Sequence, residues 1–233
     1  MGASAGRVTW DGTGQKKYKR GVSCGMLYLW NATSSKWEGV PWNGLTNVTE
    51  SPEGGDAEDF YADNILYASL RGVEKLNGSI EAYTYPDEFE ECVGHDSLAT
   101  GIRIGQQNRI PFCFAYRVEL GNDSNPNAGY EIHLIYNATA SAAEMSNDTD
   151  EDSPNLEPLS FDFSCNPVPV TGKKPTSSLV LDSTKVAAGK LTILEDALYG
   201  KNAVAANAEQ NITASDATIP YMPLPDDILT LIA

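Results

Sequence analysis

Histidines, cysteines and carboxylates are the residues of this chain that could do chemistry, and their spacing predicts no catalytic or metal site. His95 and His133 are the only histidines, and neither lies in an HExxH pattern or beside a Gly-x-Ser-x-Gly turn. A zinc site would need cysteine partners at short spacings, which are not found among Cys24, Cys92, Cys113 and Cys165. We therefore expect His133 to be a packing or interface residue and the cysteines to be reduced structural thiols.

Two segments match ligand-binding loops only in part. The pattern of a calcium loop is matched at its first three ligand positions, Asp148, Asp150 and Asp152. Ser153 replaces the turn glycine and Leu159 the closing glutamate, so an EF-hand is rejected and a loose cation site is the minor alternative. Gly101–Gly105 does not precede a helical pattern, which a phosphate-binding loop requires. The sequence thus predicts no catalytic residue, no cofactor and no bound metal.

The net charge of −16, from 32 acidic and 16 basic residues, argues against nucleic-acid binding through phosphate neutralisation, which needs clustered Lys and Arg. An acidic surface instead repels phosphates and lets DNA pass without adhering. One small basic cluster is expected to be a flexible arm or a salt-bridging patch; it consists of Lys16, Lys17, Lys19 and Arg20. No apolar run is long enough to cross a bilayer, and no secretion signal is recognised. A protein made in the cytoplasm is expected.

Asn-x-Ser/Thr sequons keep a second interpretation open. They are more frequent than chance pairing suggests, and with the Trp residues they fit a secreted carbohydrate-binding or adhesive β-sandwich domain. Asn, Ser and Thr also collect at turns and strand edges of β-rich chains, and this simpler explanation is favoured. The sequons begin at Asn31, Asn47, Asn77, Asn122, Asn137, Asn147 and Asn211. A jelly-roll hydrolase with paired carboxylates ranks last, because no acidic pair stands out.

Most of the chain consists of β-prone runs separated by turn residues. Residues 1–19 are predicted to form an N-terminal arm and residues 20–200 a single β domain. Strands are expected at Gly21–Trp30 and in KWEGVPW, joined by the NATSSK turn. Ile65–Val73 and Gly78–Tyr85 are predicted to pair across EKLNG. A stronger hairpin signal lies in FCFAYRVEL and GYEIHLIYNATA, with turn-rich GNDSNPNAG between them.

Two helices and two further strands complete the predicted domain. PDEFEECVG starts with Pro86, carries acids in its first turn and ends at Gly94, as expected of a short helix. LSFDFSC alternates like a half-buried strand, and PTSSLVLDS is the last strand. KLTILEDALYG has apolar residues at helical spacing, with Gly200 at the cap position. The polar segment Ser141–Pro158 is predicted to be a surface loop.

Two segments are predicted to dock onto another surface. Gly39–Asn64 contains a Ser-Pro step, a Gly-Gly pair and five acidic residues from Glu50 to Asp59, and a loop of such length is usually functional or disordered. Aromatic residues bracket this loop, which favours docking. Residues 201–233 are predicted to form a C-terminal arm with an apolar end, and such an end is tied either to its own domain or to a neighbour. Its polar tether favours the neighbour.

Several segments, in order between Gly21 and Val170, resemble the major tail tube proteins of long, non-contractile (siphophage-type) bacteriophage tails. Each segment is weakly specific, and their ordered set is the stronger signal. The last sixty residues match less clearly. The matching segments are Gly21-Val22, Gly39–Gly55, YADNILYASL, EAYTYPDEF, IGQQNR, FCFAYR and YNATAS.

The resemblance implies a mainly β fold, a β-sandwich or barrel-like tail tube fold with a flanking α-helix, a long inter-ring loop and extended N- and C-terminal arms. Copies would form hexameric rings, in which one sheet of each copy closes into a barrel around a lumen. Rings would stack into a tube that conducts DNA into the host bacterium. The resemblance implies no enzyme activity and no membrane association.

It also implies partners, a location and contact residues. The partners are further copies of the chain, the tape measure protein, the tail terminator and distal tail proteins, and genomic DNA that passes without specific binding. The protein would be part of the virion, assembled in the bacterial cytoplasm. Residues 46–61 would be the stacking loop, with contacts from Trp42, Glu50, Glu53, Asp56, Glu58, Asp59, Phe60 and Tyr61. The C-terminal arm would contact an adjacent subunit through Tyr221, Leu224, Ile228, Leu229 and Ile232.

Overall fold

The computed structural model describes residue 7 and residues 10–143, 145, 149, 156–204 and 214–232. Within these ranges the chain is mainly β and its strands pair antiparallel, as predicted. One sheet follows the order β13-β2-β1-β9-β10-β11-β6-β3, and β12 pairs with β10 beside this path. Its strands are β1 (Lys17–Asn31), β2 (Lys36–Trp42), β3 (Leu45–Gly54), β6 (Glu74–Ala82), β9 (Phe112–Asn122), β10 (Gly129–Ala140), β11 (Leu159–Cys165), β12 (Ser178–Asp182) and β13 (Tyr221–Met222).

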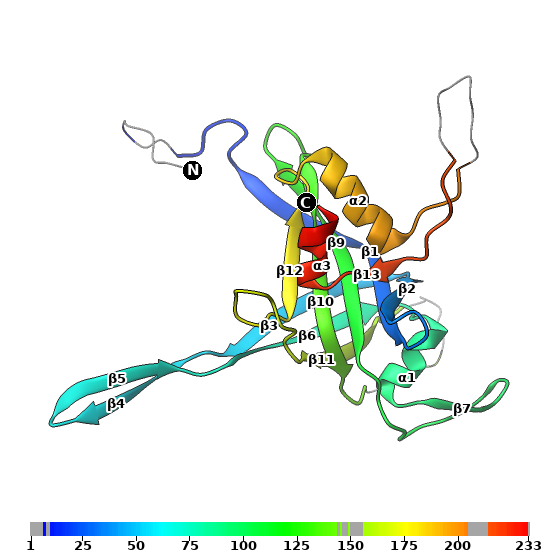
Figure 1. Cartoon of the computed structure of the whole chain (residues 1–233), viewed down its shortest axis with the longest axis horizontal. Helices are drawn as coiled ribbons and strands as arrows, with labels where there is room; N and C mark the ends of the chain where they lie inside the picture. The colour runs from blue at the N-terminus through cyan, green and yellow to red at the C-terminus, as the bar shows by residue number, and fades with distance from the viewer. Residues whose placement is uncertain are drawn as a thin grey trace.

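Strand β10 pairs with two different strands along the edge opposite β9, and this divides the sheet. Its first half pairs with β12 from Glu131 to Ile135, and its end pairs with β11 from Ala138 onward. Between them the register to β9 shifts, and Asn137 adopts a φ of 49°. Beyond this point β11, β6 and β3 fold back over one face of β1, β9 and β10, so that both groups of strands share one core (Figure 1).

The first core, between the two groups of strands, contains Trp42. This side chain is 2% exposed, and its ring lies 4.5 Å from that of Phe89 and 5.5 Å from that of Phe114. Its Nε1 donates a hydrogen bond to the Thr84 carbonyl at 2.8 Å. The prediction that Trp42 contacts a neighbour is therefore wrong. The residue ends β2, and the alternation of that strand directs it inward.

The second core covers the opposite face of β1, β9 and β10 and is closed by two helices, α2 (Ala188–Tyr199) and α3 (Pro225–Leu231). The Tyr28 hydroxyl donates to the Leu198 carbonyl near the end of α2 at 2.8 Å. Ile228 of α3 is 4% exposed in the same cluster. Each face of the central strands is thus covered by the protein's own chain.

Both helices predicted from the sequence are confirmed. PDEFEECVG forms the 3-10 helix η1 (Asp87–Phe89) and α1 (Glu90–Val93), which ends at Gly94 with a φ of 87°. KLTILEDALYG forms most of α2, and Gly200 follows at a φ of 77°. Glycine is suited to both positions because it adopts positive φ without a steric penalty.

The predicted strands are confirmed in the centre of the sheet and wrong at two places. β1 begins at Lys17, so the last residues of the predicted arm 1–19 belong to the sheet. The hairpin predicted between Ile65–Val73 and Gly78–Tyr85 does not form, because β6 pairs with β3 instead. The strands β9, β10, β11 and β12 form where the sequence predicts them.

Replacing Trp42 with alanine should lower the free energy of unfolding by about 3–5 kcal/mol, because the ring fills a closely packed aromatic core. Urea unfolding monitored by circular dichroism measures the change. Trp30→Ala is the matched control, since Trp30 is 52% exposed and its loss should cost less than about 1 kcal/mol. Similar losses in the two variants would contradict this assignment of the core.

Candidate functional site

A two-stranded ribbon projects far beyond the body of the protein (Figure 1). It consists of β4 (Ala57–Ala62) and β5 (Ile65–Arg71), and we call it the long ribbon. Asp63 and Asn64 connect its strands, with positive φ values of 51° and 62°. Positive φ at both central residues is typical of a type I′ turn, whose twist matches that of paired strands. The long ribbon is therefore a hairpin with a tight turn, and its strand register shifts once, between Phe60 and Tyr61.

The long ribbon continues the pair formed by β3 and β6 through a glycine joint. Gly54 and Gly55 have φ values of 82° and 73°. A Cβ atom on Gly54 would lie 2.8 Å from the Val73 carbonyl oxygen, so a larger residue would force the strands apart. On the other strand, the amide of Gly72 donates to the Asp56 carbonyl at 3.3 Å. The two chain segments therefore stay side by side through the joint, where the β3–β6 pair ends and the β4–β5 pair begins.

The prediction of a loop at residues 46–61 is therefore wrong. This segment forms most of β3 and β4, and it pairs with β5 and β6. Its acids, glycines and Pro52 suggested a loop, but β3 is the last strand of the sheet, and proline is tolerated on such an edge. The signal that could have revealed the hairpin is Asp63-Asn64, a turn dipeptide between two β-prone runs.

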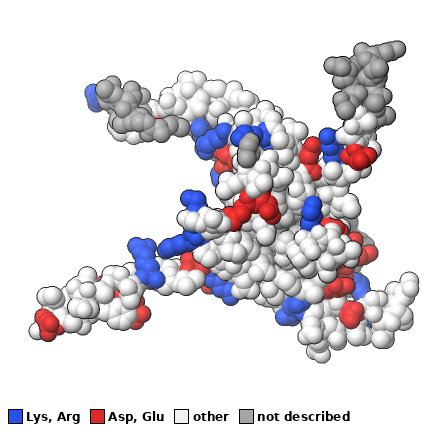
Figure 2. Space-filling model, viewed as in Figure 1, with Lys and Arg blue, Asp and Glu red and all other residues white. Residues whose placement is uncertain are grey.

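The long ribbon exposes large apolar side chains beside its acids. Tyr61 lies opposite Leu66 and Phe60 opposite Ala68 in the strand register. An isolated two-stranded hairpin is at best marginally stable in water, and contiguous exposed apolar side chains usually mark an interaction site. Figure 2 shows acidic residues at its far end. The exposed apolar residues are Phe60 (44%), Tyr61 (70%), Ile65 (65%), Leu66 (52%), Tyr67 (77%) and Leu70 (61%).

A second projection, the short ribbon, consists of β7 (Asp96–Ala99) and β8 (Ile102–Ile104) (Figure 1). It exposes Leu98 and Ile102. Its base is held by Glu90, a buried carboxylate of α1 that accepts a hydrogen bond from the Tyr85 hydroxyl at 2.9 Å. His95 Nδ1 and Arg103 Nη1 also contact this carboxylate. Because His95 directly precedes β7 and Arg103 lies within β8, Glu90 fixes the direction of the ribbon relative to the body.

Glu50 is half-buried, and its carboxylate is held by groups of its own chain. The Tyr116 hydroxyl donates to Glu50 Oε1 at 2.6 Å, and His133 Nδ1 lies 2.9 Å from the same atom. His133 stacks on Tyr116, and its Nε2 lies 3.4 Å from Glu131 Oε2, which also pairs with Lys19. Burial alone would raise the pKa of Glu50, but the hydrogen bonds from His133 and Tyr116 outweigh it and the pKa lies below its usual value. This network ties β3, the root of the long ribbon, to the central strands.

The remaining predicted contact residues divide between the long ribbon and the body. Glu53 Oε2 accepts a hydrogen bond from Asn77 Nδ2 at 2.7 Å within the β3–β6 pair. The other residues are exposed on the long ribbon and remain available to a partner. They are Asp56, Glu58, Asp59, Phe60 and Tyr61.

The C-terminal segment is held by its own chain. β13 pairs with β2, and the Gly39 amide donates to the Pro220 carbonyl at 2.9 Å. The prediction that Ile228 contacts an adjacent subunit is wrong, because this side chain completes the second core. Leu224 and Leu229 remain exposed, whereas Tyr221 and Ile232 are half-buried.

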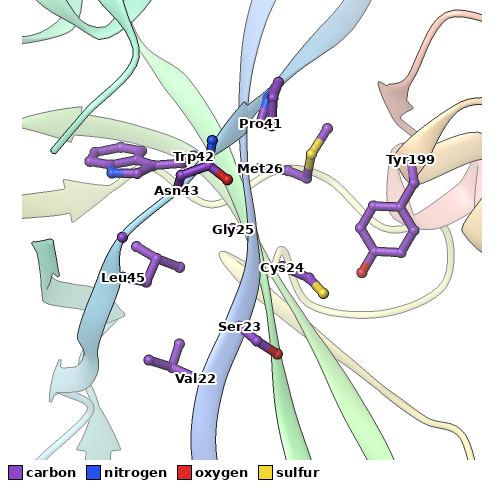
Figure 3. A pocket seen from close by; sticks show the side chains of 11 residues that line it. Val22, Ser23, Cys24, Gly25, Met26, Pro41, Trp42, Asn43, Leu45 and Tyr199 are labelled. Carbon is purple, nitrogen blue, oxygen red and sulfur yellow. The ribbon is translucent and has the colours of Figure 1, made fainter. Parts of the chain in front are cut away.

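A notch of about 300 Å³ lies where β2 leaves β1 (Figure 3). The register between β1 and β9 shifts there, and Cys24 adopts a φ of 53°. Its thiol is exposed and faces Tyr199, whose hydroxyl is buried and has no hydrogen-bond partner in the described part of the chain. Apolar side chains, among them Val22 and Leu45, complete the lining. Among the residues that the structure describes, no histidine or carboxylate lines the notch to act as the base that would activate a nucleophilic cysteine.

The structure brings no catalytic or metal-binding group together among the residues it describes. No set of three or more His, Cys, Asp or Glu side chains could hold a metal ion in these ranges. Asp148, Asp150 and Asp152 lie outside them. Cys92, Cys113 and Cys165 are buried free thiols, and burial raises the pKa of each to about 12. None of the helices in the described part of the chain is long and apolar enough to span a membrane.

Comparison with known proteins adds no assignment: no family model matches this chain, and no curated protein matches it significantly.

Replacing Glu50 with glutamine should lower the free energy of unfolding by about 1 kcal/mol at neutral pH. A carboxyl group whose pKa is lowered by folding adds stability above its unfolded pKa, and this stability is lost as the pH falls through the folded pKa. The difference between wild type and variant should therefore shrink below the usual glutamate value of 4.5. Urea unfolding between pH 3 and pH 7 tests this, with Glu58→Gln on the exposed ribbon as control. A difference that does not change with pH would contradict the assignment.

Proposed function

We propose that this chain is a structural, self-assembling protein of the major tail tube class, the subunit of a long, non-contractile bacteriophage tail. The observation that supports this most is the long ribbon, which carries apolar side chains far from both cores of the chain. A monomer gains nothing from exposing them, whereas an assembly can bury them. The ordered sequence segments that resemble tail tube proteins support the same conclusion.

In this proposal the folded-back sheet is the β-sandwich of the tail tube fold. The exposed strand edges would be covered when hexameric rings close, which removes the hazard of uncontrolled strand pairing. The long ribbon would be the inter-ring stacking segment, and the short ribbon would make a second contact. The well-filled cores of the chain favour a rigid building block for such rings.

The charge of the chain fits a passive conduit. Acidic side chains that face the lumen would repel DNA phosphates and limit adhesion during ejection. Besides further copies of itself, the chain would contact the tape measure protein and the tail terminator and distal tail proteins. The proposal assigns no catalytic activity, no cofactor and no membrane contact, and it places the protein in the virion after assembly in the bacterial cytoplasm.

One observation favours a second candidate function, carbohydrate binding. A groove of about 360 Å³ is lined by Trp30, Trp37 and Tyr221. The two Trp rings meet at 67° with centroids 5.5 Å apart, and Trp30 is half exposed. Flat aromatic faces of this kind could stack on sugar rings. Binding on a glycan array that is lost in Trp30→Ala would favour this candidate over a structural role.

Electron microscopy of the purified protein tests the structural proposal. Rings or tubes are expected, and a strictly monomeric protein at high concentration would contradict it. The triple variant Phe60→Asp, Tyr61→Asp, Leu66→Asp should abolish stacking and leave the thermal midpoint of the monomer unchanged, because the ribbon lies outside both cores. Ile193→Asp, at a similarly exposed position of α2, is the control and should still assemble. Normal tubes from the triple variant would show that the ribbon does not stack the rings.

A further inference from the structure

The outer edge of β1 is unpaired along its first half. β2 pairs with β1 only from Gly25 to Asn31, whereas β9 pairs on the other side from Lys17 onward. In the described ranges no strand pairs with the outer edge between Lys17 and Cys24. Such an edge presents free N–H and C=O groups and is a template for adding a strand from another chain. We call this segment the free edge.

The basic cluster noted in the sequence lies at the start of the free edge, with Lys16 directly before it. Lys16, Lys17, Lys19 and Arg20 are all exposed, in a chain whose net charge is −16. One explanation for lysines on an edge strand is that they prevent unwanted pairing with other chains. They also create a local positive potential, which attracts an acidic strand and repels a basic one.

The notch at the inner end of the free edge can receive a side chain. It lies between Val22–Met26 and the segment that follows β2, and Tyr199 closes one side (Figure 3). Its lining combines apolar groups with the Tyr199 hydroxyl, a buried group that lacks a hydrogen-bond partner. A side chain that carries both an aromatic ring and a polar atom would satisfy both parts of this lining.

The long ribbon has the complementary features. β4 pairs only with β5 along one side, so its own outer edge is also free among the described strands. Asp56, Glu58 and Asp59 lie at its start, and the exposed aromatic residues Phe60 and Tyr61 follow them. The free edge, Lys17–Cys24, has more residues than β4, Ala57–Ala62, and its register to β9 shifts after Arg20 and after Ser23.

We propose that β4 of a second copy adds as a strand to the free edge, with its acids against the basic cluster and one of its aromatic rings in the notch. The inference rests on the proposed function, because the occupant is another copy of the chain. Beyond the proposed function, it names the free edge and the notch as the surface that binds the long ribbon. Opposite charges that face each other across paired strands stabilise the pairing, and like charges destabilise it.

A charge exchange tests the pairing. Lys16→Glu with Lys17→Glu should weaken association about tenfold, and Asp56→Lys with Glu58→Lys should do the same, because each places like charges across the interface. The two lysines make no side-chain ion pair within the described chain, so their exchange should not disturb the fold. Combining both pairs in one chain should restore wild-type association, measured by sedimentation velocity at low salt. A combined variant as weak as either parent, or weaker, would overturn the proposal.

Crosslinking locates the contact without relying on affinity. Cys24 is the only exposed native thiol, since the other three cysteines are buried, and it lies at the end of the free edge. Glu58→Cys treated with a short bismaleimide should give dimers whose linked peptides join residues 24 and 58 of different copies. Leu98→Cys, on the short ribbon, is the matched control and should give far fewer links to Cys24. Adding Cys24→Ser should remove the product.

The outcomes separate this inference from the proposed function. Tubes in the microscope with ribbon crosslinks elsewhere than at Cys24 would leave the tail tube proposal intact and overturn the strand addition. Crosslinks to Cys24 in a protein that forms only dimers would support the strand addition and contradict the tail tube proposal. Equal crosslinking of Glu58→Cys and Leu98→Cys would overturn the strand addition, because it would show no preference for the long ribbon.

Discussion

The change of partner along β10 is the constraint on which the rest of the structure depends. One half of its outer edge binds β12 and the other half binds β11, so the sheet must part at Asn137. The group β11-β6-β3 is then free to fold back, and it covers one face of the central strands. The other face is left to α2 and α3. Without this break in the sheet, β11, β6 and β3 would not cover the aromatic residues of the first core.

Parts of this architecture could be predicted from sequence because their signals are local. The hairpin of β9 and β10 has strong β-prone runs around a turn, and α1 and α2 have glycines at their ends. The long hairpin from Leu45 to Ala82 could not be predicted in the same way. Its root depends on pairing between residues far apart, such as Glu50 with Gly78, and its composition is that of a loop.

The same limit applies to the candidate site. The sequence groups the acidic and aromatic residues at positions 56–61 with Trp42 and Glu50, although Trp42 is buried and Glu50 is half-buried. The apolar residues of β5 have the pattern of an ordinary strand, which gives no signal that they are exposed. The sequence predicts that Ile228 contacts a neighbour, but this residue is buried in its own chain. An apolar terminus indicates that its side chains will be buried, but the sequence does not show whether its own domain or a neighbour buries them.

Because the long ribbon is a two-stranded hairpin, its length can change by whole pairs of residues. Side chains alternate between the faces of a strand, so two residues added to each of β4 and β5 would keep every outward group on its original face. Such an insertion would lengthen the ribbon by about 7 Å and leave the glycine joint and the Asp63-Asn64 turn intact. In a stacked assembly the length of the ribbon would then set the distance between successive rings. Chains with ribbons of different length could therefore differ in ring spacing while keeping the same cores.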